Sequence, residues 1–167
     1  LGVVTSAAKA DLTVPETMAL AYEMMTTLNK SARDVMVRYR VHACTDVTGF
    51  GLLGHLYEMA RGSDVRLRLD TAQIRFLPQA LDLARMGILP EGMYRNREFA
   101  QEAVEPGNTE LAVQDLLYDP QTAGGLVIAC HPEDADALWE ALQGAVPCAQ
   151  RIGVAESRDD GPWILLG

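Results

Sequence analysis

Residues 64–70 alternate between apolar and charged side chains, and this alternation limits the folds that the chain can adopt. Val65, Leu67 and Leu69 are separated by Arg66 and Arg68. Successive side chains of a β-strand point to opposite faces, so the pattern predicts a strand with one buried and one exposed face. Such strands are typical of antiparallel sheets, because parallel sheets are covered on both faces. We therefore expect a mostly antiparallel sheet.

Helices and strands are expected along the rest of the chain. Thr13, Pro15 and Glu16 are typical of a helix start. The apolar residues that follow at helical spacing, and that we expect to face the core, are Met18, Ala21, Tyr22, Met25 and Leu28. Further predicted helices cover residues 32–39, 50–61, 78–86, 110–117 and 132–142, with Gly62 and Gly87 ending the second and third.

Strands are predicted over residues 1–7, 41–47, 125–130, 148–154 and 163–166. Residues 88–108 contain two prolines and two glycines and are expected to form a long loop or a poorly formed helix. Because helices and strands mix without regular β-α alternation, the predicted fold class is α+β. The length predicts a single domain over residues 1–167.

The charge balance and the hydropathy of the chain exclude two kinds of partner. The chain has 14 basic and 23 acidic residues, which give a formal net charge of -9. Nucleic acid is therefore not an expected partner, since a broad basic face is missing. A membrane is not expected either, because no segment approaches the roughly 20 apolar residues that a spanning helix needs.

The cysteines and the first residues bear on the compartment of the protein. Cys44, Cys130 and Cys148 lie far apart, and their odd number argues against a disulfide framework. A reducing, cytoplasmic location is therefore expected. The opening residues have no basic segment before their apolar part, unlike a signal peptide. The lack of an initiator Met suggests a fragment or a processed chain.

Residues 42–55 form the densest group that could carry chemistry. Asp46 lies at the predicted end of a strand, a turn with Thr48, Gly49 and Gly51 follows, and a helix then begins. Glycines let the backbone approach a ligand, the helix N-terminus presents free N–H groups, and a carboxylate beside them can hold Mg²⁺ bridging to a phosphate. Alternatively, Asp46 or Thr48 caps the helix and the glycines only make a tight turn. The residues alone support both interpretations about equally.

Three potential ligands in this segment share one face of the predicted strand. His42, Cys44 and Asp46 are spaced two residues apart, and a transition metal could use such ligands. A zinc-type site is disfavoured, because no second cluster supplies further ligands. We expect Cys44 to be a small core residue, and His55 to pack or cap rather than catalyse.

Residues 117–128 form the second segment of interest. Asp119 and Pro120 favour a turn, and Gly124 and Gly125 lead into a predicted strand. A buried polar loop here could complete a ligand pocket. A structural connection whose glycines allow close packing is the favoured interpretation.

The two segments together resemble selenophosphate synthetase (selenide, water dikinase). The matching residues are Thr45-Asp46-Val47-Thr48-Gly49-Phe50-Gly51-Leu52 and Asp119-Pro120-Gln121-Thr122-Ala123-Gly124-Gly125-Leu126. The resemblance covers nearly the whole chain but only the C-terminal half of that enzyme, and Ala123 replaces the Ser of many members. It implies an α+β fold like the C-terminal domain of aminoimidazole ribonucleotide synthetase, with a mostly antiparallel sheet covered by helices.

The resemblance also implies an activity and a set of site residues. The family converts selenide, ATP and water into selenophosphate, AMP and orthophosphate, and it requires Mg²⁺. Asp46 matches the acidic metal ligand of this half, and Thr48, Gly49 and Gly51 would lie near the phosphates. The nucleophile and most ATP contacts belong to an N-terminal domain absent from this chain, so we assign no catalytic residue here and expect the fragment to be inactive alone. The full-length protein is expected to be a homodimer with ATP and selenide as its small-molecule partners.

Two other functions stay open at this point. One is a related ATP-dependent synthetase or kinase with another substrate, such as a purine or thiamine intermediate. The other is a non-catalytic interaction module. In the sequence upstream of Leu1, a Gly-rich segment with Cys or selenocysteine shortly before Lys would support the selenium enzyme, and the absence of ATP-site aspartates would support the interaction module. Dependence of AMP formation on selenide would separate the two enzymes.

Overall fold

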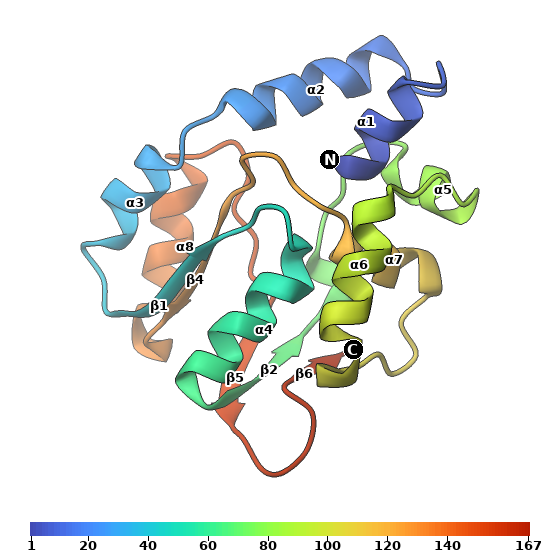
Figure 1. Ribbon diagram of the computed structural model, residues 1–167. Coiled ribbons are helices and arrows are strands. Elements are labelled where there is room, and N and C mark those ends of the chain that lie inside the picture. Colours follow the sequence, from blue (N-terminus) through green and yellow to red (C-terminus); the bar gives the residue numbers. More distant parts are fainter.

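Two β-sheets form the framework of the molecule, which a computed structural model describes over residues 1–167 (Figure 1). β1 (Val41–Asp46) pairs antiparallel with β4 (Leu126–Cys130). The second sheet has the strand order β3-β6-β2-β5, formed by Val104–Glu105, Ile164–Leu166, Val65–Leu69 and Gly153–Ser157. In it β2 pairs antiparallel with β5, whereas β6 runs parallel to β2 and β3. The predicted α+β class is confirmed, with one sheet antiparallel and the other mixed.

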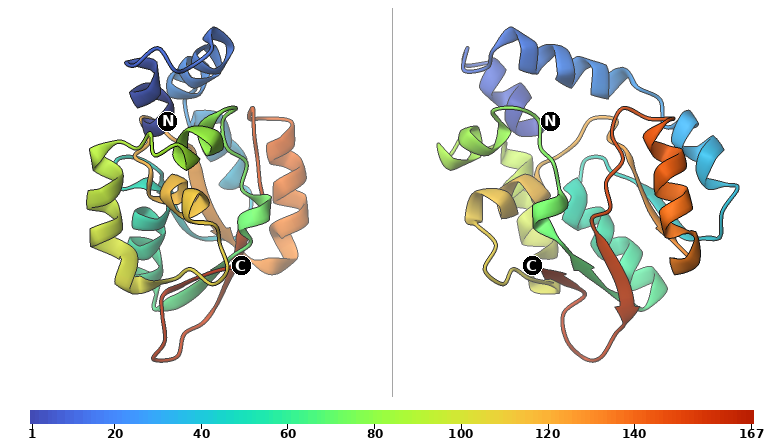
Figure 2. Two further views of the ribbon diagram at one scale, coloured as in Figure 1. Left: turned by 90° about the vertical axis from the view of Figure 1, so that its right-hand side faces the viewer. Right: turned by 180° about the vertical axis from the view of Figure 1, so that it is seen from behind.

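Eight helices surround the sheets. They are α1 (Gly2–Ala8), α2 (Pro15–Thr26), α3 (Lys30–Met36), α4 (Gly51–Ser63), α5 (Ala80–Arg85), α6 (Glu91–Ala100), α7 (Leu111–Tyr118) and α8 (Ala135–Gln143). Short 3-10 turns occupy Thr71–Gln73, Gln101–Ala103 and Pro132–Asp134. The view turned by 90° shows α4 and α6 on one side of the strands and α8 on the other (Figure 2). No helix combines the length and the apolar character needed to cross a membrane.

The main core lies between α4 and the mixed sheet. Leu53 and Leu56 of α4 are fully buried against Leu67, Leu69 and neighbouring strand residues. Burying one leucine side chain contributes about 1.5–3 kcal/mol, so this face holds α4 firmly on the sheet. The alternation predicted for β2 is confirmed, because Leu67 and Leu69 are buried and Arg68 between them is exposed. Apolar packing therefore sets the position of the α4 N-terminus relative to the strands.

The predicted strand over residues 1–7 is wrong, since this segment forms α1. Val3, Val4 and Ala7 are completely buried at helical spacing in a second core cluster. A short apolar run fits a strand or a buried helix equally well, and the partner of the segment decides between them. That partner is Asp119, whose Oδ1 accepts a hydrogen bond from the Val3 N–H over 2.9 Å.

Of the two alternatives expected for residues 88–108, the long loop is wrong, and the helix is found as the regular ten-residue α6 at the centre of the segment. Pro90 stands at the N-cap, and Met93, Asn96 and Ala100 make the buried face of the helix. Gly92 lies inside the helix, where a Cβ atom would approach Pro120 Cγ to 3.0 Å. The glycine that suggested a loop is therefore a contact point between α6 and residues 119–121.

Several smaller expectations also differ from the structure. α4 continues past Gly62 and ends where Asp64 adopts a left-handed conformation with φ 50°. The strand expected at 148–154 begins only at Gly153, whose missing Cβ leaves room for the Arg68 carbonyl oxygen. In α2, Ala21 is buried but Tyr22 is exposed, and Leu28, which follows the end of the helix, is exposed as well rather than directed into the core. The helical spacing of apolar residues therefore predicted α2 correctly, but part of its apolar face is exposed because no other element packs against it.

Candidate functional site

The turn between β1 and α4 lies directly beside the loop that follows α7. The main-chain oxygen of Thr48 accepts hydrogen bonds from the N–H groups of Gly51 and Gln121, each over 3.0 Å. The Val47 N–H donates to the Gly125 carbonyl over 3.0 Å. The two segments singled out in the sequence, more than 60 residues apart, therefore form one structural unit.

Two glycines make this close approach of backbones achievable. At Gly51, where φ is +70°, a Cβ atom would lie 2.6 Å from the Tyr118 carbonyl oxygen. At Gly124, a Cβ atom would lie 2.2 Å from the Val47 carbonyl oxygen. Real side chains do not tolerate such distances, so both positions exclude a Cβ for packing reasons. Gly51 lies buried beneath the turn, with its N–H bonded to Thr48.

Asp46 lies at the exposed end of β1. Its carboxylate accepts no hydrogen bond and forms no ion pair, although its main-chain oxygen accepts a hydrogen bond from the Thr45 hydroxyl. The alternative that Asp46 or Thr48 caps the helix is wrong, because the N-cap of α4 is Phe50 and no side chain caps it. The carboxylate is therefore an accessible, uncommitted oxygen donor, which fits a hard cation such as Mg²⁺.

The other potential ligands of β1 lie on the same exposed face as Asp46. His42 and Cys44 alternate with half-buried neighbours, so Cys44 is not the core residue that we expected. Partial burial, followed by the charge of Asp46, raises the pKa of the Cys44 thiol. Nowhere in the structure do three His, Cys, Asp or Glu side chains converge on one point that could hold a metal ion.

An open cleft of about 610 Å³ lies between the turn, α4 and α6. Thr48, Gly49, Phe50, His55, Gly92, Arg95, Asn96 and Pro120 line it. Of the residues predicted to lie near a phosphate, Thr48 and Gly49 thus line the cleft, whereas Gly51 does not. The predicted metal ligand, Asp46, does not line it either. A Cβ at Gly49 would meet nothing within 4 Å, so its backbone is open to a ligand.

Sequence reasoning missed the α6 wall of this cleft because residues 88–108 were expected to be irregular. Arg95 and Asn96 come from that helix. The buried positions Met93, Asn96 and Ala100, spaced three and four residues apart behind Pro90, are the signal that could have identified it.

Asn96 joins the two sequence segments across the cleft. Its Nδ2 donates to the carbonyl oxygens of Gly49, over 2.8 Å, and Tyr118, over 2.9 Å. We predict that Asn96→Ala lowers the free energy of unfolding by about 2 kcal/mol, because the buried carbonyl of Tyr118 and the partly buried hydrogen bond to the Gly49 carbonyl lose their donor. Urea unfolding of the 167-residue chain measures this loss. Glu98→Ala, on the exposed face of α6, should change it by less than about 0.5 kcal/mol, and equal stability of both variants would contradict the role of Asn96.

His55 lies beneath Thr48 and is more than a packing residue. The side chain is buried, and its Nε2 lies 3.1 Å from Thr48 Oγ1. Its Nδ1 lies 3.3 Å from Glu58 Oε2. We expected packing or capping; the structure shows an imidazole that lines the cleft and contacts a polar group on each side.

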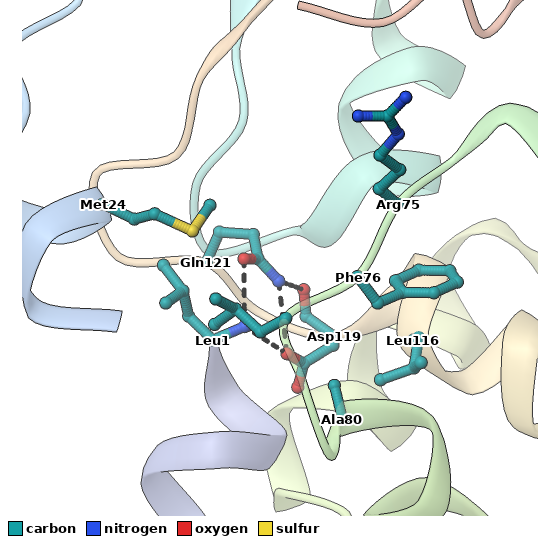
Figure 3. A pocket seen from close by; sticks show the side chains of 9 residues that line it. Leu1, Met24, Arg75, Phe76, Ala80, Leu116, Asp119 and Gln121 are labelled. Atoms are coloured by element: carbon teal, nitrogen blue, oxygen red, sulfur yellow. Dashed lines mark hydrogen bonds and ion pairs between the residues drawn. The ribbon is translucent and has the colours of Figure 1, made fainter. Parts of the chain in front are cut away.

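The loop after α7 is held by a buried carboxylate. Asp119 accepts a hydrogen bond from the Val3 N–H over 2.9 Å. Figure 3 shows that Asp119 also contacts the Leu1 nitrogen, over 2.9 Å, and that Gln121 contacts the same nitrogen. Burial raises the pKa of the Asp119 carboxyl, and the hydrogen bond from the Val3 N–H opposes this shift. The adjoining cavity, lined also by Phe76 and neighbouring side chains, is about 90 Å³. The favoured interpretation as a structural connection agrees with these contacts, which tie α1 to the site loop.

Comparison with known proteins decides the family. A family model described as "AIR synthase related protein, C-terminal domain" matches residues 2–162. The chain belongs to this family. Curated relatives called selenide, water dikinase are similar to it over nearly its whole length, as the motifs predicted. The protein of Treponema denticola is 44% identical over 164 residues, and that of Clostridium botulinum (strain Eklund 17B) is 38% identical over 166 residues.

These alignments leave a large part of each relative uncovered. They include 95% and 99% of this chain but only 46% and 48% of the two relatives. The relative from Caldanaerobacter subterraneus is 44% identical over 142 residues, which are 85% of this chain and 41% of that protein. The chain therefore spans slightly less than half the length of the curated relatives it matches.

Proposed function

We propose that this chain is the C-terminal half of an ATP-dependent enzyme that makes selenophosphate from selenide, ATP and water. AMP and orthophosphate are the other products. The observation that carries the proposal is the 44% identity, over 95% of the chain, to a protein called selenide, water dikinase. The absent half supplies the nucleophile, and the full-length protein acts as a cytoplasmic homodimer. The three free cysteines agree with a reducing compartment.

Asp46 is the contribution of this half to a Mg²⁺ site. Its carboxylate is exposed and unpaired at the end of β1, so binding a cation breaks no existing interaction. Asp46 would hold the ion through one of about six positions, and the remaining oxygen ligands would have to come from outside this chain. When bound, the ion neutralises charge that develops on the transferred phosphoryl group.

Thr48 and Gly49 orient the phosphate groups at the edge of the cleft. The net charge of -9 means that the field of this domain repels a polyphosphate, so binding depends on local groups. Arg95 is the one cationic side chain that lines the cleft, and Glu91 pairs with it. This leaves little positive charge for ATP on this half, in agreement with a role for the cation.

Selenide dependence tests the proposal most directly. We expect the full-length protein to release AMP from ATP only when selenide is present, with selenophosphate appearing in ³¹P NMR spectra. The 167-residue chain alone should release neither ADP nor AMP above the buffer rate, because it lacks the nucleophile and most ATP contacts. AMP formation by the full-length protein without selenide would contradict this substrate assignment and support a related kinase.

A further inference from the structure

Residues 12–28, which include α2, carry a concentration of exposed apolar side chains. α2 lies along the outside of the molecule and packs against α1 through the side on which Thr17 and Ala21 are buried (Figure 1). Six of the fourteen large apolar residues exposed in the whole chain lie in this segment, namely Leu12, Val14, Leu20, Tyr22, Met24 and Leu28. Soluble domains seldom leave so many apolar side chains together in water, so this surface indicates a docking partner.

Leu20 and Met24 share one face of α2, and we call this pair the α2 patch. They are four residues apart, which places their side chains one above the other on a helix. Their exposed fractions are 42% and 45%. Tyr22 is two residues from each of them, so it points to the opposite side of the helix, where it is 59% exposed. The uncovered apolar surface of α2 is therefore wider than the side that α1 covers.

The α2 patch adjoins the cavity in which the nitrogen of Leu1 lies. Met24 and Leu1 both line this cavity, and Figure 3 shows Met24 reaching it from α2. The Leu1 nitrogen lies 2.9 Å from Asp119 Oδ2 and 3.0 Å from Gln121 Oε1. Consecutive Cα atoms are only about 3.8 Å apart, so a residue bonded to that nitrogen lies beside the cavity and close to Met24.

We propose that the polypeptide preceding Leu1 in the full-length protein packs on the α2 patch. That such a polypeptide exists rests on the proposed function, in which this chain is one half of a longer protein, as in the relative of which it covers 46%. Leu20 and Met24 are separated by about 6 Å along the helix axis, and two or three residues of extended chain span that distance. A short segment is thus sufficient to cover both side chains.

The covalent bond to Leu1 favours this occupant over a second copy of the chain. A segment attached at the edge of the patch is present there at a high effective concentration, so weak apolar contacts are enough to seat it. A second copy would have to be brought to α2 by an interface of its own. The preceding polypeptide is also the one partner whose position the structure restricts, through the place of the Leu1 nitrogen.

Docking at the α2 patch would also support the loop of residues 119–125. Asn29, which follows α2, donates from Nδ2 to the Gly124 carbonyl over 3.0 Å. At the other end of the loop, the Gln121 N–H donates to the Thr48 carbonyl over 3.0 Å. A segment that packs on α2 beside Leu1 therefore stabilises the elements that hold this loop against the turn at the cleft.

Thiol labelling of the full-length protein tests whether the α2 patch is covered. Leu20→Cys and Met24→Cys place a thiol in the patch, and Tyr22→Cys places one on the opposite side of the same helix as the matched control. We expect a maleimide to label positions 20 and 24 about tenfold more slowly than position 22, because a covered thiol is not accessible to the reagent. Mass spectrometry of peptides separates these sites from the three native cysteines. Equal rates at the three positions would overturn the inference.

Thermal unfolding checks that each cysteine variant is folded, and Leu20→Cys carries the test if Met24→Cys is unstable. A photo-cross-link then identifies what covers the patch. With p-benzoylphenylalanine in place of Met24 in the full-length protein, we expect a cross-link within one polypeptide, to a residue upstream of Leu1. The same probe in place of Tyr22 should form little of this product. A cross-link to a second copy, which doubles the mass on a denaturing gel, or one confined to residues 1–167 would overturn the inference.

Neither readout depends on turnover. A protein that shows the protected thiols and the upstream cross-link, but no selenide-dependent AMP formation, would contradict the proposed function alone. Selenide-dependent AMP formation together with unprotected thiols at positions 20 and 24 would contradict the inference alone.

Discussion

Asp46→Asn in the full-length protein is expected to reduce the rate of AMP formation about a hundredfold or more. The substitution keeps the size of the side chain but removes the charge that we propose binds Mg²⁺. A loss of about 2.7 kcal/mol in transition-state stabilisation corresponds to that factor. The measurement is selenide-dependent AMP formation over a range of Mg²⁺ concentrations, in which the variant should also require more Mg²⁺.

The stability of this variant should hardly change, because the Asp46 carboxylate is exposed and has no hydrogen-bond or ion-pair partner. A matched control is Asp160→Asn, which makes the same change of charge at another exposed position without a partner. It should leave the rate within about twofold, since distant surface charges are screened by salt. If Asp46→Asn keeps normal turnover and Mg²⁺ dependence but unfolds at a much lower temperature, the metal assignment is wrong and the residue is structural.

Gly124→Ala is expected to lower the free energy of unfolding of the chain by about 3 kcal/mol. The added Cβ would lie 2.2 Å from the Val47 carbonyl oxygen and 3.2 Å from the carbonyl carbon. Backbone atoms on both sides cannot withdraw without breaking the contact between the loop and the turn, and overpacking of this kind costs about 1–3 kcal/mol or more. Urea unfolding followed by circular dichroism gives the change, as a lower midpoint with an unchanged slope.

The neighbouring glycine provides the control for this prediction. At Gly125 a Cβ would meet nothing within 4 Å, and φ is not positive. Gly125→Ala should therefore stay within about 0.5 kcal/mol of the original chain. A similar loss in both variants would mean that backbone flexibility, rather than the close approach to Val47, explains the glycines of this loop.

Local patterns in the sequence determined the parts of the fold that depend on local geometry. The alternation of Val65, Leu67 and Leu69 predicted the strand and its buried face, which β2 confirms. The start signal at Pro15 predicted a helix, and α2 begins at that residue. Two glycine-containing motifs identified the segments that meet at the cleft. Strand alternation repeats every two residues, and the start signal and the glycine motifs are short contiguous segments, so neighbours along the chain are sufficient to define each of them.

Only the tertiary structure decided what these segments do to one another. The sequence around Val3 and Val4 fits a strand as well as a helix. The helix forms where Asp119, far along the chain, accepts a hydrogen bond from the Val3 N–H. Helical spacing in α6 does not reveal what its side chains contact, yet Asn96 joins Gly49 to Tyr118 and Arg95 completes the cleft wall. His55 is isolated in the sequence, and only folding places its nitrogens beside Thr48 and Glu58. The physical reason is that apolar packing of α4, α6 and α7 sets these distances, and no local periodicity encodes a contact between distant segments.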